Sequence, residues 1–67
     1  MLISERIKEL RLEKDLSVAA LSKEVQISPR AINFYEAGQK LPGAHNIIKL
    51  AKFFNVTSDY LLGLKDY

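Results

Sequence analysis

The sequence has 67 residues, 48% of them hydrophobic and 27% charged, which is enough for one domain over residues 1–67 and too short for a second. With no cysteine, one histidine and no apolar run near the roughly 20 residues of a membrane-spanning helix, we expect no disulfide, metal or other cofactor, or membrane segment. The formal net charge of +2 is compatible with a nucleic-acid partner, but the placement of the charges has to decide that question.

The first predicted element is a helix over residues 5–14. The apolar residues Ile3, Ile7 and Leu10 recur at spacings of three and four among charged side chains, which is typical of an amphipathic helix. Ser4 directly precedes this segment, and a serine oxygen accepts hydrogen bonds from free amides of a first helical turn. We therefore expect Ser4 to be the N-cap.

Two short helices follow, with a turn between them that is too brief for regular structure. Ser17 is placed to cap the second predicted helix, Val18–Val25. The third, over residues 29–37, starts at Ser28-Pro29, because serine caps free amides and proline at the first helical position loses no needed donor. Gly38 ends this helix, since glycine adopts the left-handed conformation of a helix end without steric cost.

Two further helices are predicted after a loop over residues 39–43. The fourth covers about Ala44–Phe54 and ends at Asn55, which is suited to a left-handed stop. The fifth covers Ser58–Leu62, follows the capping residue Thr57 and ends at a glycine. Strand signals and internal repeats are missing from the sequence, so the predicted class is all-α with five helices.

A set of residues in a particular order and spacing extends over about residues 3–63. Its segments are Arg6–Arg11, Leu16-Ser17, Leu21, Ile27-Ser28, Ile32, Tyr35–Gly38, Pro42, Leu50–Lys52 and Val56–Gly63. In this order, almost without insertions, they resemble the phage repressor, Cro and Xre family of DNA-binding domains. The resemblance implies a compact, lambda-repressor-like domain in which the second and third helices form a helix-turn-helix.

The sequence departs from the family pattern around the second helix. Val18 stands where a glutamine that helps to grip phosphate often sits, Gln26 where the turn usually carries glycine, and Ala20 where an acidic residue would complete a capping box. We expect the loss of one phosphate hydrogen bond at Val18. A left-handed conformation at Gln26 would cost on the order of 1 kcal/mol.

The third helix has two different faces. Ile32 and Tyr35 lie on one side at helical spacing, whereas Arg30, Asn33 and Phe34 share the other. Arginine bonds guanine O6 and N7, asparagine pairs with adenine, and phenylalanine contacts a thymine methyl group. The alternative is that Arg30 and Asn33 are only solvated and Phe34 belongs to the core. The resemblance implies base contacts at Pro29, Arg30, Asn33 and Phe34.

Most of the affinity for DNA would come from contacts to phosphates. The start of the second helix and the backbone amides that open the fourth helix offer N–H groups, and lysines supply positive charge. The expected phosphate contacts are Arg11, Ser17, Val18, Lys23, Lys40 and Asn46. His45 is interpreted as a solvated side chain without a chemical role.

Arg11 and Glu36 occupy positions that form an ion pair in the family. The resemblance therefore implies that Arg11 braces the recognition helix and approaches a phosphate as well. A partly buried pair would cost about 3 to 5 kcal/mol to break, whereas an exposed pair would contribute less than about 1 kcal/mol.

The expected function is sequence-specific binding of double-stranded DNA by a transcriptional regulator, most simply a repressor that occludes a promoter. A 67-residue globule covers one half-site, so we expect a homodimer on a palindromic operator. Apolar residues off or near the margin of the inward stripes are candidates for the dimer contact: Leu12, Phe53, Tyr60, Leu64 and Tyr67. They can equally be ordinary exposed side chains.

The sequence does not favour an enzyme. It has no combination of nucleophile, base and orienting group that would indicate a catalytic site, and no phosphate-binding glycine loop. No small-molecule ligand is expected, and the location should be cytoplasmic, at the nucleoid. The alternative function is a protein-interaction module, such as an antitoxin or an adaptor, which could use the same helical bundle.

Overall fold

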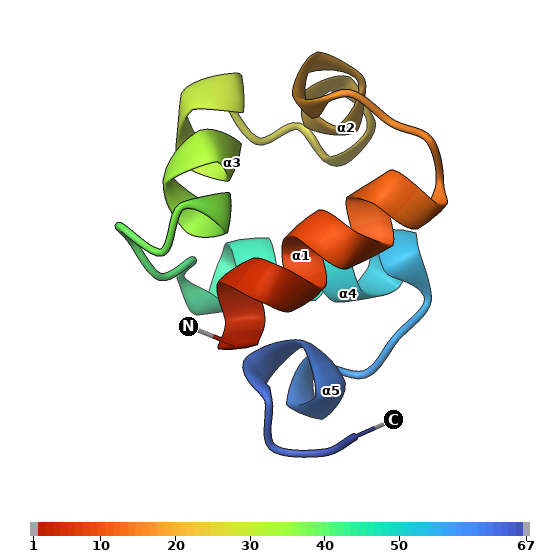
Figure 1. Cartoon of the computed structure of the whole chain (residues 1–67), viewed down its shortest axis with the longest axis vertical. Coiled ribbons are helices and arrows are strands. Elements are labelled where there is room, and N and C mark those ends of the chain that lie inside the picture. The colour runs from red at the N-terminus through yellow and green to blue at the C-terminus, as the bar shows by residue number, and fades with distance from the viewer. Residues whose placement is uncertain (1, 67) are drawn as a thin grey trace.

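The computed structural model describes residues 2–66, which form five α-helices and no strand. The helices are α1 (Leu2–Glu13), α2 (Val18–Val25), α3 (Pro29–Glu36), α4 (Ala44–Phe54) and α5 (Ser58–Leu62). In Figure 1, α1 crosses the centre of the view, α2 and α3 lie above it, α5 lies below it and α4 passes behind it. The predicted all-α class is confirmed. None of the helices is both long and apolar enough to cross a membrane.

Each helix contributes one large side chain that is fully buried. In chain order from α1 to α5 these are Ile7, Leu21, Ile32, Leu50 and Leu61, each 0% exposed. Burial of one such side chain stabilises the folded state by about 1.5 to 3 kcal/mol. The core is therefore complete only when all five helices are in place.

The prediction that Ser4 caps the first helix is wrong. α1 begins at Leu2, and Ser4 lies inside it with 4% of its surface exposed. The physical reason is Ile3, which is buried one helical turn before Ile7 and joins the core only if the helix extends to it. Burial of an apolar side chain, and not a local cap, sets this boundary. At its other end α1 stops at Glu13, one residue earlier than predicted.

The three later N-caps have the predicted geometry. The hydroxyl oxygens of Ser17, Ser28 and Thr57 accept hydrogen bonds from amides three residues further on, at 3.0, 3.1 and 3.0 Å. Gln26 and Asn55 end α2 and α4 in the left-handed conformation, with φ values of 56° and 58°. Local side-chain chemistry therefore sets most of the helix ends, as predicted.

The pair of helices α2 and α3 forms the helix-turn-helix. Their connection consists of the three residues 26–28, and α3 packs against both α1 and α2. α3 ends at Glu36, one residue before its predicted end, and Gly38 follows with φ of 74°. This packing leaves one side of α3 at the surface of the molecule.

Candidate nucleic-acid interface

α3 has a buried face and an exposed face. Ile32 and Tyr35 are 0% and 7% exposed, whereas Arg30 and Asn33 are exposed. Phe34 is half-buried, but it is not one of the apolar residues that pack against the core. The helix therefore presents a guanidinium and an amide to solvent, the two groups suited to guanine and adenine in a major groove.

Arg30, Phe34 and Lys40 form a cluster at one edge of α3. Arg30 Cζ lies 5.5 Å and Lys40 Nζ lies 4.9 Å from the centroid of the Phe34 ring. The cluster borders a surface cavity of about 410 Å³, which is also lined by Ser28, Ala31, Tyr35 and Leu41. The structure thus brings together two predicted base contacts and one predicted phosphate contact. The other two predicted base contacts, Pro29 and Asn33, are exposed on the same helix.

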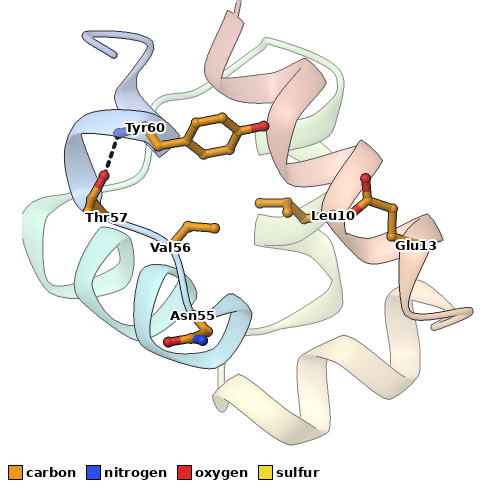
Figure 2. Close-up of a pocket in the computed structure, with 6 residues that line it drawn as sticks. All are labelled: Leu10, Glu13, Asn55, Val56, Thr57 and Tyr60. Carbon is orange, nitrogen blue, oxygen red and sulfur yellow. Dashed lines mark hydrogen bonds between the residues drawn. The ribbon is translucent and has the colours of Figure 1, made fainter. Parts of the chain in front are cut away.

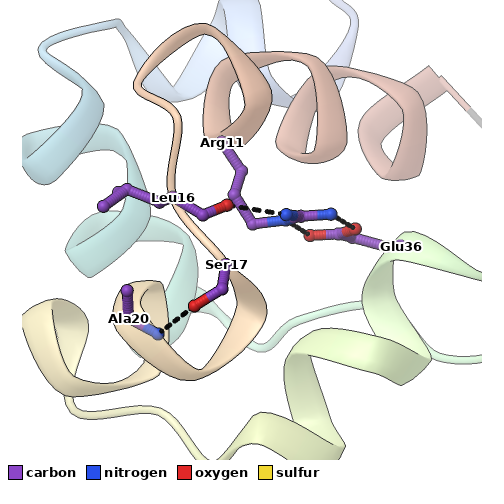
Figure 3. A network of polar contacts seen from close by, with 5 residues as sticks. All are labelled: Arg11, Leu16, Ser17, Ala20 and Glu36. Atoms are coloured by element: carbon purple, nitrogen blue, oxygen red, sulfur yellow. Dashed lines mark hydrogen bonds and ion pairs between the residues drawn. The ribbon is translucent and has the colours of Figure 1, made fainter.

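A second polar group joins α1 to the end of α3, as Figure 3 shows. Arg11 Nε and Nη2 donate to the two carboxylate oxygens of Glu36 at 2.7 and 2.9 Å, and Arg11 Nη1 donates to the Leu16 carbonyl at 2.7 Å. The two charged side chains are 12% and 9% exposed. The hydrogen bond to Glu36 raises the pKa of Arg11, burial opposes the increase, and the charge of Glu36 adds to it.

Arg11 also lies beside the start of α2. It bonds the carbonyl of Leu16, and the next residue, Ser17, caps the helix (Figure 3). The first amides of α2 have no acceptor within the helix, and a helix N-terminus carries partial positive charge. Val18 packs its side chain against the core, so it offers its backbone alone. Three predicted phosphate contacts, Arg11, Ser17 and Val18, therefore lie close together.

The remaining predicted phosphate contacts are more dispersed. Lys23 is exposed in the last turn of α2, at the opposite end of that helix from Ser17. Asn46 lies in the first turn of α4, whose N-cap, Gly43, makes no side-chain hydrogen bond. Asn46 Nδ2 donates to the Tyr35 hydroxyl at 2.9 Å, a contact that was not predicted. Asn46 therefore ties α4 to the buried face of α3.

The turn between α2 and α3 is fastened by two side chains that were not predicted to take part. The Ser22 hydroxyl donates to the Ile27 carbonyl, and the Ser22 carbonyl accepts the amides of Gln26 and Ile27. Lys49 Nζ, from α4, donates to the Gln26 carbonyl at 3.3 Å. A serine inside a helix, just before a turn, is the sequence signal that could have indicated the first contact.

Arg6 on α1 binds the C-terminal segment. Arg6 Nη1 donates to the carbonyls of Tyr60 and Lys65, and Arg6 Nη2 lies 3.7 Å from Asp66 Oδ1. The Arg6 guanidinium carbon also lies 4.2 Å from the centroid of the Tyr60 ring. This group was not predicted, because its acceptors are backbone carbonyls that no side-chain pattern reveals.

The five residues considered for a dimer contact have different surroundings. Leu12 and Leu64 are 53% and 72% exposed, respectively. Phe53 is half-buried and packs edge-on against the ring of Phe54, and Tyr60 lies against Arg6. Tyr67 lies outside the described residues. A role of these residues in dimerisation stays a prediction.

A separate surface cavity of about 490 Å³ lies between α1 and the chain that links α4 to α5 (Figure 2). Its lining consists of Leu10, Glu13, Asn55, Val56, Thr57 and Tyr60. None of the predicted DNA contacts lines this cavity, so the candidate interface does not include it. Within residues 2–66, histidine, aspartate and glutamate side chains form no group of three or more that could hold a metal ion.

Five helices, a three-residue turn between α2 and α3 and an exposed polar face on α3 define a helix-turn-helix domain. The chain belongs to this family, because the family model described as Helix-turn-helix (HTH_3) matches residues 7–61. The resemblance to phage repressor, Cro and Xre domains is thereby confirmed. Its relatives and structural neighbours are regulators of transcription and not enzymes.

Two relatives illustrate the family. The HTH-type transcriptional regulator YobD of Bacillus subtilis (strain 168) is 32% identical over 62 residues, which cover 92% of this chain and 55% of YobD. The HTH-type transcriptional activator BcrR of Enterococcus faecalis is 34% identical over 62 residues, which cover 92% of this chain and 30% of BcrR. The chain thus spans about half the length of YobD and less than a third of BcrR.

The c2 repressor of Salmonella phage P22 has a similar structure and sequence. The crystal structure of that repressor in complex with synthetic operator 9T matches this chain with a TM-score of 0.85 and 34% identity. The match covers 91% of this chain and 92% of the repressor chain in that crystal. The predicted lambda-repressor-like helix-turn-helix fold is therefore confirmed.

Proposed function

We propose that this chain binds double-stranded DNA at specific sequences and regulates transcription in that way. The observation that carries the proposal is the division of α3, in which Ile32 and Tyr35 anchor the helix while Arg30 and Asn33 are exposed. Arginine and asparagine make the side-chain pairs that distinguish guanine and adenine in the major groove. The likeness to a repressor that was crystallised with a synthetic operator supports this use of the helix.

In this proposal, Pro29, Arg30, Asn33 and Phe34 contact bases, and the six predicted phosphate contacts position the domain on the duplex. Arg11 reaches phosphate with the guanidinium N–H groups that Glu36 and Leu16 do not use. The amides at the starts of α2 and α4 complete the backbone contacts. Base contacts then supply the specificity, and phosphate contacts supply most of the affinity.

The proposed biological role is repression by a homodimer that occludes a promoter at a palindromic operator on the nucleoid. The likeness to the P22 c2 repressor supports this choice, although a relative such as BcrR is an activator. A reporter gene tests the choice directly. An operator placed across the promoter should lower transcription, whereas increased transcription from an operator placed upstream would favour activation.

A salt titration with a random duplex tests DNA binding itself. Neutralisation of phosphates releases counterions, so the logarithm of the affinity should fall linearly with the logarithm of the salt concentration. Fluorescence anisotropy of a labelled duplex measures this slope. A lack of binding at low salt would refute the proposal and leave a protein-interaction module as the better explanation.

Single variants test the assignment of contacts on a duplex selected from a random pool. We expect Arg30→Ala to weaken binding to the selected duplex by about 1 to 3 kcal/mol and to relax one base position. Lys40→Ala should weaken binding to selected and random duplexes alike. Lys52→Ala removes the same charge from an exposed part of α4 and serves as the control. Equal losses on both duplexes for Arg30→Ala would contradict base reading.

A further inference from the structure

The ring of Phe34 is contacted by two cations from different parts of the chain. Arg30 approaches it from one turn earlier on α3, with Cζ 5.5 Å from the ring centroid, and Lys40 approaches from the loop after α3, with Nζ at 4.9 Å. Both distances are within the roughly 6 Å at which a cation is attracted by an aromatic ring. Two like charges repel each other, so some feature of the local structure must bring both cations to the same ring.

The backbone of α3 and of the loop after it brings the two cations to the ring. On a helix, side chains four residues apart are neighbours and lean toward the N-terminus, so the ring of Phe34 leans toward Arg30. After α3, the amides of Gln39 and Lys40 donate to the Phe34 carbonyl at 2.9 and 3.4 Å. These bonds fold the loop back on the helix. The same residue thus anchors the loop with its carbonyl and contacts both cations with its ring.

Both cations have free N–H groups in the part of the chain that the structure describes. Within residues 2–66, the side chains of Arg30 and Lys40 make no hydrogen bond or ion pair, and both residues are exposed. Attraction to a ring uses the positive charge and leaves the N–H groups able to bond other acceptors. Phe34 itself is half-buried without packing against the core. Within residues 2–66, the cations that contact its ring are the two residues proposed to bind DNA.

From this geometry we infer that Phe34 is a positioning residue, which holds Arg30 and Lys40 in one cluster so that a base contact and a phosphate contact form together. The inference rests on the proposed DNA binding. Arginine and lysine side chains lose rotamer freedom when they bind, and the ring removes part of that freedom before DNA arrives. This role replaces the base contact proposed for Phe34 above, in which its ring would act alone on a thymine methyl group.

Proton NMR of the free protein tests the contact between the Phe34 ring and Lys40 in the absence of DNA. A ring within 5 Å shifts the resonances of nearby protons, so the ε-methylene protons of Lys40 should be displaced from those of Lys8, an exposed lysine on α1. The displacement should persist in Phe34→Tyr and vanish in Phe34→Leu. Lys40 resonances that match Lys8 in the unmodified protein would overturn the inference. Because no DNA is present, this result is independent of the proposed function.

A double-mutant cycle tests the coupling on a duplex selected by the unmodified protein. One cation–ring contact at an exposed site corresponds to about a two- to fivefold change in affinity. We therefore expect the combined loss of Arg30→Ala and Lys40→Ala to differ from the product of the single losses by about that factor. In the Phe34→Leu background the losses should simply multiply, and Phe34→Tyr should restore the coupling. The same coupling with leucine at this position would overturn the inference.

The competing role as a methyl reader has its own signature. Deoxyuridine in place of thymine removes the methyl group from the duplex and leaves every hydrogen-bonding edge intact. If Phe34 acts through Arg30 and Lys40, the Phe34→Leu loss should be the same on thymine and deoxyuridine duplexes. A loss that disappears on every deoxyuridine duplex would assign Phe34 to methyl recognition instead. Absence of duplex binding by the unmodified protein would refute the proposed function, while the NMR experiment would still test the cluster.

Discussion

At the scale of single residues, the orientation of α3 depends on the pair of Arg11 and Glu36. Both side chains are nearly buried, and the guanidinium satisfies both carboxylate oxygens and the Leu16 carbonyl at once. Such bidentate, charge-assisted bonds fix direction as well as distance. The pair therefore holds the end of α3, close to the exposed residues proposed to contact bases.

We predict that Glu36→Ala lowers the free energy of unfolding by about 3 to 5 kcal/mol. The substitution leaves the Arg11 guanidinium buried without its carboxylate, which costs more than the loss of the attraction alone. For a domain of this size, the melting temperature should fall by at least about 12 °C. Calorimetry or thermal circular dichroism measures the change.

Lys65→Ala is the matched control for Glu36→Ala. Lys65 Nζ lies 3.9 Å from Asp59 Oδ2, and both side chains are 50% exposed, so loss of this pair should change stability by less than about 1 kcal/mol. Replacement of both Arg11 and Glu36 by leucine should recover part of the loss, because no buried charge is then left. A Glu36→Ala effect as small as that of Lys65→Ala would show that the brace does not stabilise the fold.

The contribution of Arg11 should also be independent of pH across the neutral range. The hydrogen bond to Glu36 raises the pKa of Arg11 in the folded protein. A raised pKa means that this contribution is fully present below the ordinary arginine pKa and is lost only as the pH rises through the still higher folded value. The stability difference between the unmodified protein and the double variant Arg11→Leu/Glu36→Leu, which leaves no buried charge, should therefore be the same at pH values on either side of neutrality. A difference that grows steadily with pH in this range would contradict the expected sign.

Spacing was sufficient to predict the exposure of individual residues but not their partners. The helical period separates Ile32 and Tyr35 from Arg30, and the structure has the same division. The partners of Phe34 could not be predicted in this way, because the approach of Lys40 depends on how the loop folds back on the Phe34 carbonyl. Hydrophobic periodicity carries no information about the path of a loop.

At the scale of elements, helix ends with local causes were predictable, and the one with a tertiary cause was not. Ser17, Ser28 and Thr57 cap their helices because each hydroxyl reaches an amide three residues later. Ser4 has the same chemistry, but burial of Ile3 extends the helix past it. A cap pattern therefore predicts a boundary only where no apolar residue before it has a place in the core.

The turn between α2 and α3 provides a prediction at this scale. Gln26 has φ of 56°, a region that costs roughly 1 to 2 kcal/mol for a residue with a Cβ atom. Glycine removes this cost but loses more backbone entropy on folding, about 0.5 to 1 kcal/mol. We therefore expect Gln26→Gly to stabilise the fold by up to about 1.5 kcal/mol, measured as a higher melting temperature.

Gln26→Ala separates backbone strain from the loss of the glutamine side chain. Alanine keeps the Cβ atom, so it should give none of the gain expected for glycine. The bonds from Ser22 and Lys49 reach backbone atoms of the turn and remain available in both variants. Equal stability of the alanine and glycine variants would show that the left-handed conformation carries no cost here.

At the scale of the whole molecule, size limits how much DNA one copy can cover. The domain measures 28 × 23 × 20 Å, whereas the two half-sites read by helix-turn-helix dimers lie about 34 Å apart. The proposed palindromic operator would therefore require two copies, one on each half-site. Helical periodicity and caps predicted the five helices, and the family resemblance predicted their arrangement, but no single-chain pattern could assign the surface that joins two copies.

This difference in length leads to a prediction about operator spacing. If two copies bind as a dimer, insertion of about five base pairs between the half-sites rotates one of them by half a helical turn and should reduce cooperative binding strongly. An insertion of about ten base pairs restores the face of the duplex and should recover binding only as far as the dimer can stretch. Anisotropy measures the affinities, and sedimentation equilibrium counts the chains on each duplex. A single chain per duplex, with the same affinity for one half-site as for two, would show that the domain reads DNA as a monomer.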